Sequence, residues 1–281
     1  MEQTIDFENG DKYIGEVSGN YMHGKGRLIL KEGLIYEGTF ENGVLVGKGK
    51  IIYPNGAVYE GDVRIGDGKE DKFKGKGKMT MPDGQVYEGE FGNGILTGKG
   101  TITQGDIKYT GDVLNGNMIG KGKLEFEGGQ IYEGTFDATG LVQGTITYTN
   151  GNTYDGELKN LKPNGKGTMT YSGNKYTGDF VDGLREGKGI YTFENGTTYE
   201  GDFKNDMFDG FGKIINVEGG GYMGTFLAGN FHGKGVYTYP TGEVLDGSFE
   251  KGVPIGNAVV TLPTGVKKKC HFDKGVIKYD E

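Results

Sequence analysis

The sequence predicts an all-β fold: an elongated single-layer antiparallel sheet of tandem β-hairpin repeats, curved and twisted into a rod with an aromatic trough. Three observations support this prediction. Glycine accounts for 58 of the 281 residues, or about a fifth, against a usual share of roughly 7%. Tyr (18) and Phe (15) are too frequent for a disordered chain, which normally lacks aromatic residues. These residue types also recur at a fixed period along the whole chain.

A Tyr-x-Gly motif opens each unit of the repeat. Successive tyrosines of the motif are 22 or 23 residues apart, except for one interval of 28. An apolar residue follows four positions after each tyrosine, and most units then contain a Gly-Lys-Gly triplet. Such a period is typical of repeat architectures, in which each unit is one supersecondary element. The tyrosines are Tyr13, Tyr36, Tyr59, Tyr87, Tyr109, Tyr132, Tyr154, Tyr176, Tyr199 and Tyr222.

Each unit predicts two short strands joined by glycine turns. In the second unit they are IYEGTF (35–40) and GKGKIIYP (47–54), separated by the loop ENGVLV and closed by the turn Asn55-Gly56. No segment has the 3.6-residue apolar period of a helix, so no helix is expected to cover the sheet. We therefore expect one layer that curls around its own apolar face.

Alternation along the strands divides each repeat into an aromatic face and a charged face, because neighbouring side chains point to opposite sides. Tyr36, Gly38 and Phe40 share one face, while Glu37 and Thr39 take the other. Glycines on the aromatic face would let a ring lie flat over the backbone. Lysines on the charged face should form ion pairs with acidic residues of adjacent strands.

Rings and aliphatic residues of the aromatic face are also the predicted contact surface for protein partners. Two interpretations remain open, since the rings either pack on one another as a core or contact a partner. They are compatible if inner rings pack and rim residues bind. The candidate partner-binding residues are Tyr36, Phe40, Tyr53, Tyr59, Tyr87, Phe91, Tyr132, Phe136, Tyr148, Tyr154, Tyr176, Phe180, Tyr199, Phe203, Tyr222, Phe226, Tyr237 and Tyr239.

The stretch FGNGILTGKGT (91–101) superficially matches a phosphate-binding loop, but its spacing does not fit. Asn93 stands where the first glycine belongs, and Gly100 follows Lys99 where Ser or Thr is required. The same triplet recurs through the chain. The triplet is therefore a structural feature of the repeat and not a phosphate-binding loop.

Composition disfavours several classes of protein. The net charge of −8 and a pI near 5.1 disfavour nucleic acid as a partner. The single Cys270 cannot form an internal disulfide and fits a reducing compartment. The first residues lack the apolar core of a signal peptide, and no stretch reaches the length of a membrane span. We expect a cytoplasmic protein.

No catalytic residues, metal site or cofactor are expected. A catalytic site needs a unique constellation of residues, and this chain is periodic. His23 and His232 hold equivalent positions nine units apart and so cannot share a site. An insertion near 64–74 contains Asp67, Glu70 and Asp71. It lacks the spacing of a calcium loop, so a solvated loop is favoured and a docking handle is left open.

Tyr-x-Gly-x-Phe, then Gly-Lys-Gly, then an Asn-Gly-like turn, at a spacing of 23 residues, resembles the MORN repeat (membrane occupation and recognition nexus). On this basis we assign residues 1–265 to eleven tandem repeats and 266–281 to a degenerate repeat that caps the array. The resemblance implies a rod-like scaffold. Such repeats occur in ciliary axonemes, including radial spokes, in cortical and junctional cytoskeletons, and as accessory regions of lipid kinases and lysine methyltransferases.

The sequence is compatible with two functions. The first is a non-catalytic scaffold or adaptor that binds other proteins of a large assembly, in the cytoskeleton or a cilium (axoneme). The second is a peripheral membrane adaptor for anionic phospholipids. Paired lysines on a chain of net charge −8 disfavour the second, since only Lys267-Lys268-Lys269 forms an unbalanced basic run. A homo-oligomer is left open, because end strands have unpaired edges.

Overall fold

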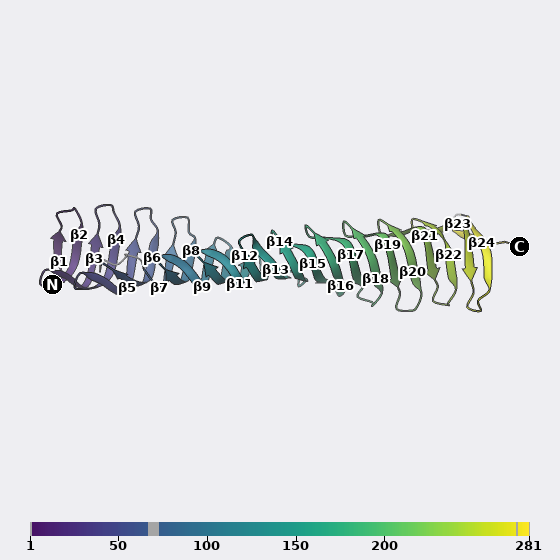
Figure 1. The fold of residues 1–281 in the computed structure, drawn as a ribbon, viewed down its shortest axis with the longest axis horizontal. Coiled ribbons are helices and arrows are strands. Elements are labelled where there is room, and N and C mark those ends of the chain that lie inside the picture. The colour runs from purple at the N-terminus through teal and green to yellow at the C-terminus, as the bar shows by residue number, and fades with distance from the viewer. Residues whose placement is uncertain (1, 67–72, 274, 281) are drawn as a thin grey trace. The chain divides into compact units, whose positions relative to one another are not determined.

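The computed structural model describes residues 2–66, 73–273 and 275–280. All regular structure in these ranges is β-strand, which confirms the predicted all-β class (Figure 1). The chain divides into two compact units, Met1–Gly140 and Leu141–Glu281. Residues 67–72 of the predicted insertion, with Asp67, Glu70 and Asp71, lie outside the described residues. Nothing in the described part of the chain forms a helix long and apolar enough to cross a membrane.

The first unit consists of short antiparallel strands that pair in sequence order, each with the next. Their bounds are β1 (Gln3–Asp6), β2 (Lys12–Ser18), β3 (Tyr21–Ile29), β4 (Ile35–Glu41), β5 (Val44–Ile52), β6 (Val58–Ile65), β7 (Gly75–Thr80), β8 (Val86–Gly92), β9 (Ile95–Gln104), β10 (Ile107–Leu114), β11 (Asn117–Phe126) and β12 (Ile131–Asp137).

The second unit repeats this arrangement from the boundary onward, again with antiparallel pairing in sequence order. Its strands are β13 (Gly140–Thr147), β14 (Thr153–Lys159), β15 (Lys162–Tyr171), β16 (Asn174–Val181), β17 (Leu184–Thr192), β18 (Thr198–Lys204), β19 (Met207–Ile215), β20 (Gly221–Leu227), β21 (Asn230–Thr238), β22 (Val244–Glu250), β23 (Val253–Thr261), β24 (Lys267–Asp273) and β25 (Val276–Tyr279).

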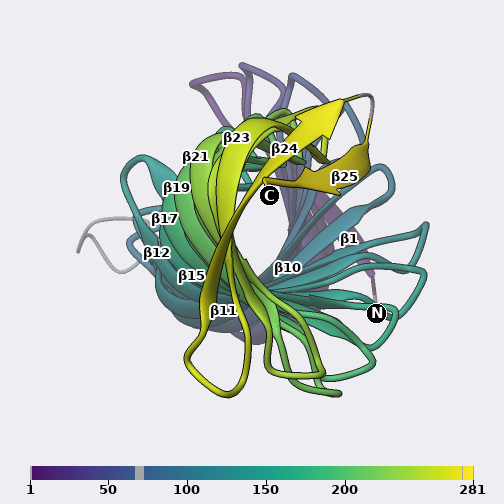
Figure 2. The same cartoon turned by 90° about the vertical axis from the view of Figure 1, so that its right-hand side faces the viewer.

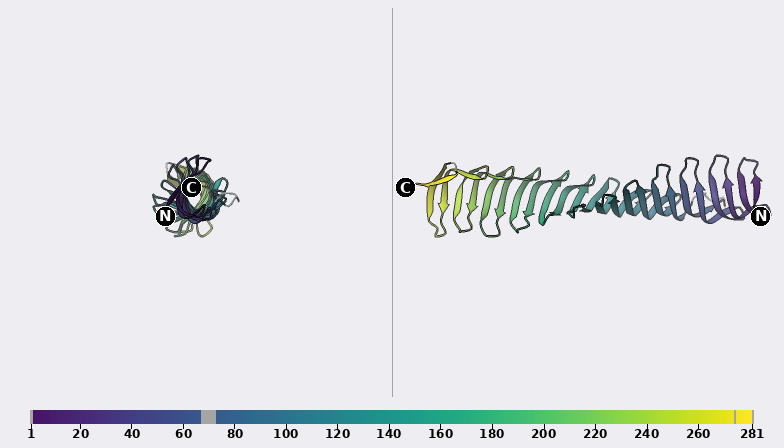
Figure 3. Two further views of the ribbon diagram at one scale, coloured as in Figure 1. Left: turned by 90° about the vertical axis from the view of Figure 1, so that its left-hand side faces the viewer. Right: turned by 180° about the vertical axis from the view of Figure 1, so that it is seen from behind.

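Within each unit the strands form one layer of successive hairpins, as the sequence predicted (Figure 3). The strands are bent rather than straight, which is clearest for β23 and β24 at the near end of the end-on view (Figure 2). Many hairpins contain a register shift just after the Tyr-x-Gly motif, for example between Gly111 and Val113. The first glycine of the triplet lies opposite this shift. Gly120 there has φ +61°, a left-handed conformation that favours glycine.

The cross-strand register aligns one glycine from each strand into a row, here called the glycine row. It crosses successive strands at right angles to their direction. In the first unit it comprises Gly15, Gly26, Gly38, Gly49, Gly61, Gly77, Gly89, Gly100, Gly111, Gly122 and Gly134. In the second unit it comprises Gly144, Gly156, Gly167, Gly178, Gly189, Gly201, Gly212, Gly224, Gly235 and Gly247.

Candidate partner-binding surfaces

Tyrosine rings cover the glycine row on the aromatic face. In the fifth repeat, a Cβ built on Gly111 would lie 2.5 Å from the Tyr109 hydroxyl oxygen, and a Cβ on Gly122 would collide with the Tyr109 ring. The Tyr109 hydroxyl donates a hydrogen bond to the carbonyl oxygen of Asp112 at 2.7 Å. Burial raises the pKa of Tyr109 to about 12. Glycine is therefore needed here because the ring occupies the space of a side chain.

Seven buried tyrosines also contact the phenylalanine of the following repeat. The rings meet edge to face, at centroid distances of 4.8–5.3 Å, the geometry preferred by aromatic pairs. Each of these contacts links one repeat to the next within a unit. The pairs are Tyr13–Phe40, Tyr59–Phe91, Tyr109–Phe136, Tyr154–Phe180, Tyr176–Phe203, Tyr199–Phe226 and Tyr222–Phe249.

Leucine takes the place of tyrosine over the glycine row in two repeats. The Leu45 side chain lies against Gly38 and Gly49, and Leu96 lies against Gly89 and Gly100. Both leucines are buried, and each stands nine residues after the tyrosine of its own repeat. Tyr87, the tyrosine that Leu96 displaces, donates its hydroxyl hydrogen to the Gln85 side chain at 2.8 Å instead. The ninth residue thus selects which side chain covers the glycines.

Most of the predicted partner-binding residues are buried in this ring cluster. A partner cannot reach them while the sheet is intact. The buried members are Tyr36, Phe40, Tyr59, Phe91, Tyr132, Phe136, Tyr154, Tyr176, Phe180, Tyr199, Phe203, Tyr222 and Phe226. The half-buried or exposed members are Tyr53, Tyr87, Tyr148, Tyr237 and Tyr239.

Three of the accessible tyrosines stand at the rim of the sheet. Tyr53, Tyr148 and Tyr239 each open a hairpin turn and donate the backbone N–H to the residue four positions later. Tyr239 is exposed, and its ring meets that of Tyr237 at 4.8 Å. Partner binding by the aromatic face therefore stays a prediction that concerns its rim.

The open grooves of both units lie on the charged face. In the first unit a groove of about 960 Å³ is lined only by charged residues and glycines, among them Lys48, Glu60 and Gly61. In the second unit a groove of about 920 Å³ lies over β13–β20. The backbone of the glycine row forms the floor of both grooves, because a side chain at these positions would point to the aromatic face, where the tyrosine rings lie. The rings fill the opposite face, so the accessible hollow is charged rather than aromatic.

Ion pairs across adjacent strands neutralise many of these charges, as the sequence predicted. Each pair joins two residues that are direct partners in the register. The pairs are Arg27–Glu37 (3.1 Å), Lys48–Asp62 (2.6 Å), Lys50–Glu60 (3.1 Å), Lys99–Asp112 (2.5 Å), Lys166–Asp179 (2.5 Å) and Lys188–Asp202 (2.6 Å).

The aspartates of these pairs also hold the irregular part of the hairpin. Asp112 accepts the backbone N–H of Lys121 at 3.0 Å, in its own hairpin, and pairs with Lys99 of the preceding one. The Lys99 ammonium and the Lys121 N–H together keep the pKa of the Asp112 carboxyl below its usual range. Asp62 is held in the same way by Lys48 and the N–H of Lys76. One carboxylate therefore ties two successive hairpins together.

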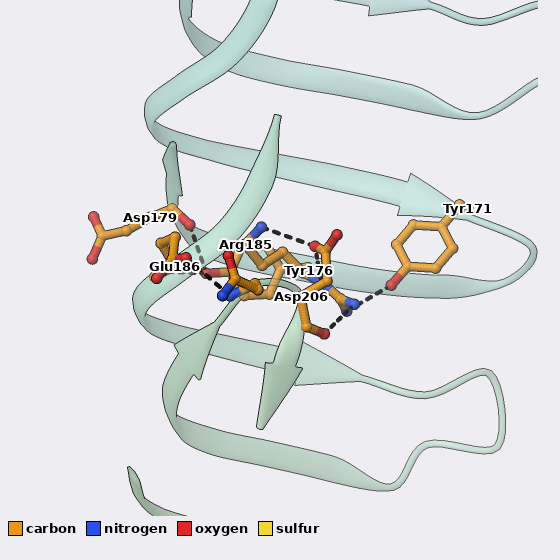
Figure 4. Close-up of polar contacts among 7 residues, drawn as sticks. Tyr171, Tyr176, Asp179, Arg185, Glu186 and Asp206 are labelled. Atoms are coloured by element: carbon orange, nitrogen blue, oxygen red, sulfur yellow. Dashed lines mark hydrogen bonds and ion pairs between the residues drawn. The ribbon is translucent and has the colours of Figure 1, made fainter. Parts of the chain in front are cut away.

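A single arginine interrupts the ring cluster of the second unit (Figure 4). Arg185 occupies the ninth position after Tyr176, which is apolar in the other repeats that lack an insertion. Its Nε donates to Asp206 Oδ1 at 3.0 Å, Nη2 to the Asp206 carbonyl at 2.7 Å, and Nη1 to the Tyr171 hydroxyl at 2.8 Å.

Aromatic rings surround the Arg185 guanidinium. Its Cζ lies 5.2 Å from the ring centroid of Tyr191 and 5.7 Å from that of Phe203, within cation–π range. Only 17% of the side chain is exposed. Because each of its three guanidinium nitrogens already donates to a partner, we interpret this cluster as a structural contact rather than a ligand site. The sequence signal was a charged residue at a position that is apolar elsewhere.

No group of three or more His, Cys, Asp or Glu side chains able to hold a metal ion occurs among the described residues. The residues that sequence reasoning missed are those of the charged-face grooves. Phe211 and Met223 line the groove of the second unit. The sequence could have indicated both residues. Phe211 replaces the lysine of a Gly-Lys-Gly triplet, and Met223 replaces the usual polar residue after the tyrosine.

Solved structures resemble the chain only distantly. The TCP10 domain of Danio rerio CPAP, in complex with a peptide of Danio rerio STIL, is 15% identical with a TM-score of 0.33, covering 95% of this chain and 97% of that one. The TCP10c domain of Drosophila melanogaster Sas-4 is 18% identical with a TM-score of 0.35, covering 62% of this chain and 99% of that one. Scores this low do not define a common fold. No curated protein sequence matches the chain.

A family model described as the MORN repeat matches more than half of the chain. The matched segments are residues 13–34, 36–58, 69–86, 87–106, 109–131, 154–174, 176–198, 199–220 and 222–244. The division into eleven repeats and a terminal cap extends beyond these segments and stays a prediction. The MORN repeat is a non-catalytic repeat. Its matches agree with the Tyr-x-Gly and Gly-Lys-Gly contacts described above, and the chain therefore belongs to the MORN-repeat family.

Proposed function

We propose that the chain is a non-catalytic scaffold that binds protein partners along its repeats, within a ciliary axonemal or other cytoskeletal assembly. Family membership supports the scaffold role. The setting follows from what the family resemblance implies. The proposed location is accordingly the cytoplasm, in the cytoskeleton or a cilium.

The observation that carries the proposal is the groove on the charged face. Within each unit the glycine row provides a floor without side chains, and residues on either side of each glycine form two walls. The same pattern recurs from strand to strand. A surface of this kind offers regularly spaced contacts to a long partner, whereas a catalytic site depends on one unique group of residues.

The accessible rings of the aromatic face form a second part of the proposed surface. Tyr53, Tyr148 and Tyr239 lie at hairpin turns, and Tyr87 and Tyr237 are half-buried. Tyrosine is enriched at protein interfaces because it combines an apolar ring with a polar hydroxyl. A partner that contacts both the rim and the groove would bind along one edge of a unit.

Isolation of the tagged full chain from cells after lysine crosslinking tests the proposal. We expect crosslinks from groove lysines such as Lys48 and Lys99 to a recurring set of cytoskeletal proteins. A matched variant exchanges the charges of one ion pair, Lys50→Glu with Glu60→Lys. It keeps the pair (3.1 Å in the native chain) but reverses the pattern that a partner meets, so partner recovery should fall while the circular dichroism spectrum is unchanged.

Two results would contradict the proposal. Equal recovery of the same partners by the exchange variant would mean that the first-unit groove is not the binding surface. Sedimentation with anionic vesicles at physiological salt, without recovery of any protein partner, would favour the membrane adaptor. The ion pairs of the charged face argue against that outcome, because lysines already paired with carboxylates attract anionic lipid weakly.

A further inference from the structure

The groove of the second unit contains apolar side chains that the first-unit groove lacks. Ile190, Phe211 and Met223 line it and are 47%, 58% and 46% exposed. The corresponding first-unit groove is lined only by charged residues and glycines. Exposed apolar side chains that converge on one hollow are typical of interaction sites. We refer to these three residues as the apolar patch.

The register brings the patch together from three strands. Phe211 on β19 pairs with Thr225 on β20, and Lys213 on β19 pairs with Met223 on β20. Phe211 and Met223 thus lie diagonally across the Gly212–Gly224 pair. Ile190 on β17 lies on the same wall as Met223. Ile190 pairs with Glu200 on β18, Glu200 pairs with Lys213 on β19, and Lys213 pairs with Met223. Only glycines separate the two walls, so the three side chains open into one hollow.

Packing inside the chain does not account for the exposed phenylalanine. Among the described residues, Phe211 contacts no other aromatic ring. Its backbone is nevertheless fixed, because its N–H donates to the Asp202 carboxylate at 3.0 Å. The backbone therefore directs the side chain toward the groove. Its exposed apolar surface is unfavourable in water, and a bound partner would cover it.

Charges next to the patch differ between the two walls. On the wall of Ile190 and Met223, Glu200 and Lys213 face each other in the register, so their charges are balanced. On the wall of Phe211, Lys188 pairs with Asp202 at 2.6 Å.

One cation on the Phe211 wall lacks a carboxylate. Lys234 on β21 has the neutral Ser248 as its register partner on β22, and on the β20 side it falls in the register shift between Gly224 and Thr225. It lines the adjoining hollow, together with Asp246, just beyond the residues that line the groove. Within the described part of the chain Lys234 forms no ion pair. A carboxylate of a partner could therefore pair with Lys234 without displacing any contact inside the chain.

The dimensions of the groove select the form of the partner. Two residues that flank one glycine of a strand are separated by about 7 Å along the strand. An extended segment lying along the glycine row alternates its side chains, so it can contact the two walls in turn, and it advances about 3.4 Å per residue. Lys234 lies two strands beyond Phe211, or about 10 Å, which is roughly three residues of such a segment.

We propose that this groove binds an extended segment of a partner protein through a large apolar side chain placed between Phe211 and Met223. A carboxylate about three residues away pairs with Lys234. Ile190 continues the apolar contact along the opposite wall. This inference rests on the proposed scaffold function, and it assigns the second unit a specific anchor within the repeated groove.

Selection of a phage-displayed library of random linear peptides on the full chain tests the proposal. The counter-selection uses Phe211→Lys, which restores the lysine found in the other triplets and should preserve the fold. We expect enriched peptides to combine an aromatic or long aliphatic residue with Asp or Glu about three positions away. Phe211→Lys should weaken their binding at least about tenfold, the usual scale for loss of an interface hot spot. Lys234→Gln should remove the preference for the acidic residue.

Four outcomes would overturn the anchor. Peptides that bind Phe211→Lys as well as the native chain would place the contact elsewhere. Failure to enrich any peptide would exclude a linear apolar–acidic partner. Sedimentation with anionic vesicles that is lost in Phe211→Lys would mean that the patch binds membrane. If only the Lys50→Glu and Glu60→Lys exchange abolishes peptide binding, the peptides bind the first-unit groove. The proposed scaffold function would then be supported, and the proposed anchor in the second unit would be wrong.

Discussion

The ring of Tyr109 lies directly on the α-carbon of Gly122, on the strand that follows its own. The Tyr109 hydroxyl reaches past Gly111 to the carbonyl of Asp112. This relationship explains why Tyr-x-Gly and Gly-Lys-Gly occur together in the repeats whose tyrosine covers the glycine row. The two glycines are register partners, and the tyrosine ring can pack here only if both positions lack a side chain.

Gly122→Ala is expected to destabilise the first unit. The new methyl group would collide with the Tyr109 ring, and overpacking of this kind costs about 1–3 kcal/mol. Gly128→Ala is the matched control, because a Cβ there meets no atom within 4 Å and Gly128 has no positive φ. Urea unfolding followed by circular dichroism measures both. Equal midpoints for the two variants would contradict the proposed ring contact.

A comparison of Leu45 with Met118 tests how the ninth position of the repeat is used. Leu45 is buried over the glycine row, whereas Met118 is 36% exposed beside a buried Tyr109. Leu45→Ala should lower the free energy of unfolding by about 2–5 kcal/mol, and Met118→Ala by less than about 1 kcal/mol. A similar loss for both would mean that the ninth residue has one role in all repeats.

The repeat, the strands and the division into two faces could be predicted because each depends on local alternation and spacing. The ion pairs across strands could also be predicted, since they follow from parity and register. Which of the two faces carries the open groove could not be predicted from the sequence. That depends on how deeply Tyr109 or Leu45 covers the glycines, a matter of three-dimensional packing. The role of Arg185 was equally out of reach, because its partner Asp206 lies in another hairpin and pairs only after folding.

Asp112 should contribute to stability in two separable ways. Asp112→Asn removes the ion pair with Lys99 but keeps an oxygen that can accept the Lys121 N–H, whereas Asp112→Ala removes both. We expect Asp112→Ala to be the more destabilising variant. The loss caused by Lys99→Met should shrink at high salt, because exposed ion pairs are screened. Identical thermal midpoints for the Asn and Ala variants would rule out the backbone contact.

The buried tyrosines should make the fold sensitive to alkali. Burial, with a smaller contribution from Asp62, raises the pKa of Tyr59 to about 12, and burial does the same for Tyr109. Folding therefore favours the neutral phenol. The stabilisation is complete below the ordinary tyrosine pKa of about 10 and is lost as the pH rises through about 12.

The measurement for this pH dependence is tyrosinate absorbance recorded together with circular dichroism. The part of the absorbance change that comes from buried tyrosines should coincide with loss of the strand signal. Ionisation of every tyrosine with the strand signal intact would show that the rings are accessible in the folded protein. At acid pH the dependence has the opposite sign, because stability falls as the pH is lowered. The pKa of the Asp112 carboxyl is lowered in the folded protein, so its contribution to stability is lost only as the pH falls below the usual aspartate range.

Replacement of Arg185 should weaken the second unit more than loss of a surface ion pair. Arg185→Met removes the donors to Tyr171 and Asp206, and hydrogen bonds made by charged groups are worth about 1.5–3 kcal/mol. Arg185→Lys should recover little of this, because an ammonium cannot reach three acceptors in the planar arrangement of a guanidinium.

Lys188→Met is the matched control for Arg185, since it breaks a pair on the exposed face of the same strand, and its loss should stay below about 1 kcal/mol. Hydrogen exchange of β17 and β18 reads out both variants locally, which matters because repeats open in part rather than all at once. Faster exchange in Arg185→Met and Arg185→Lys, with little change in Lys188→Met, is the expected result. Full protection in Arg185→Lys would mean that its positive charge alone, and not the shape of the guanidinium, holds these strands together.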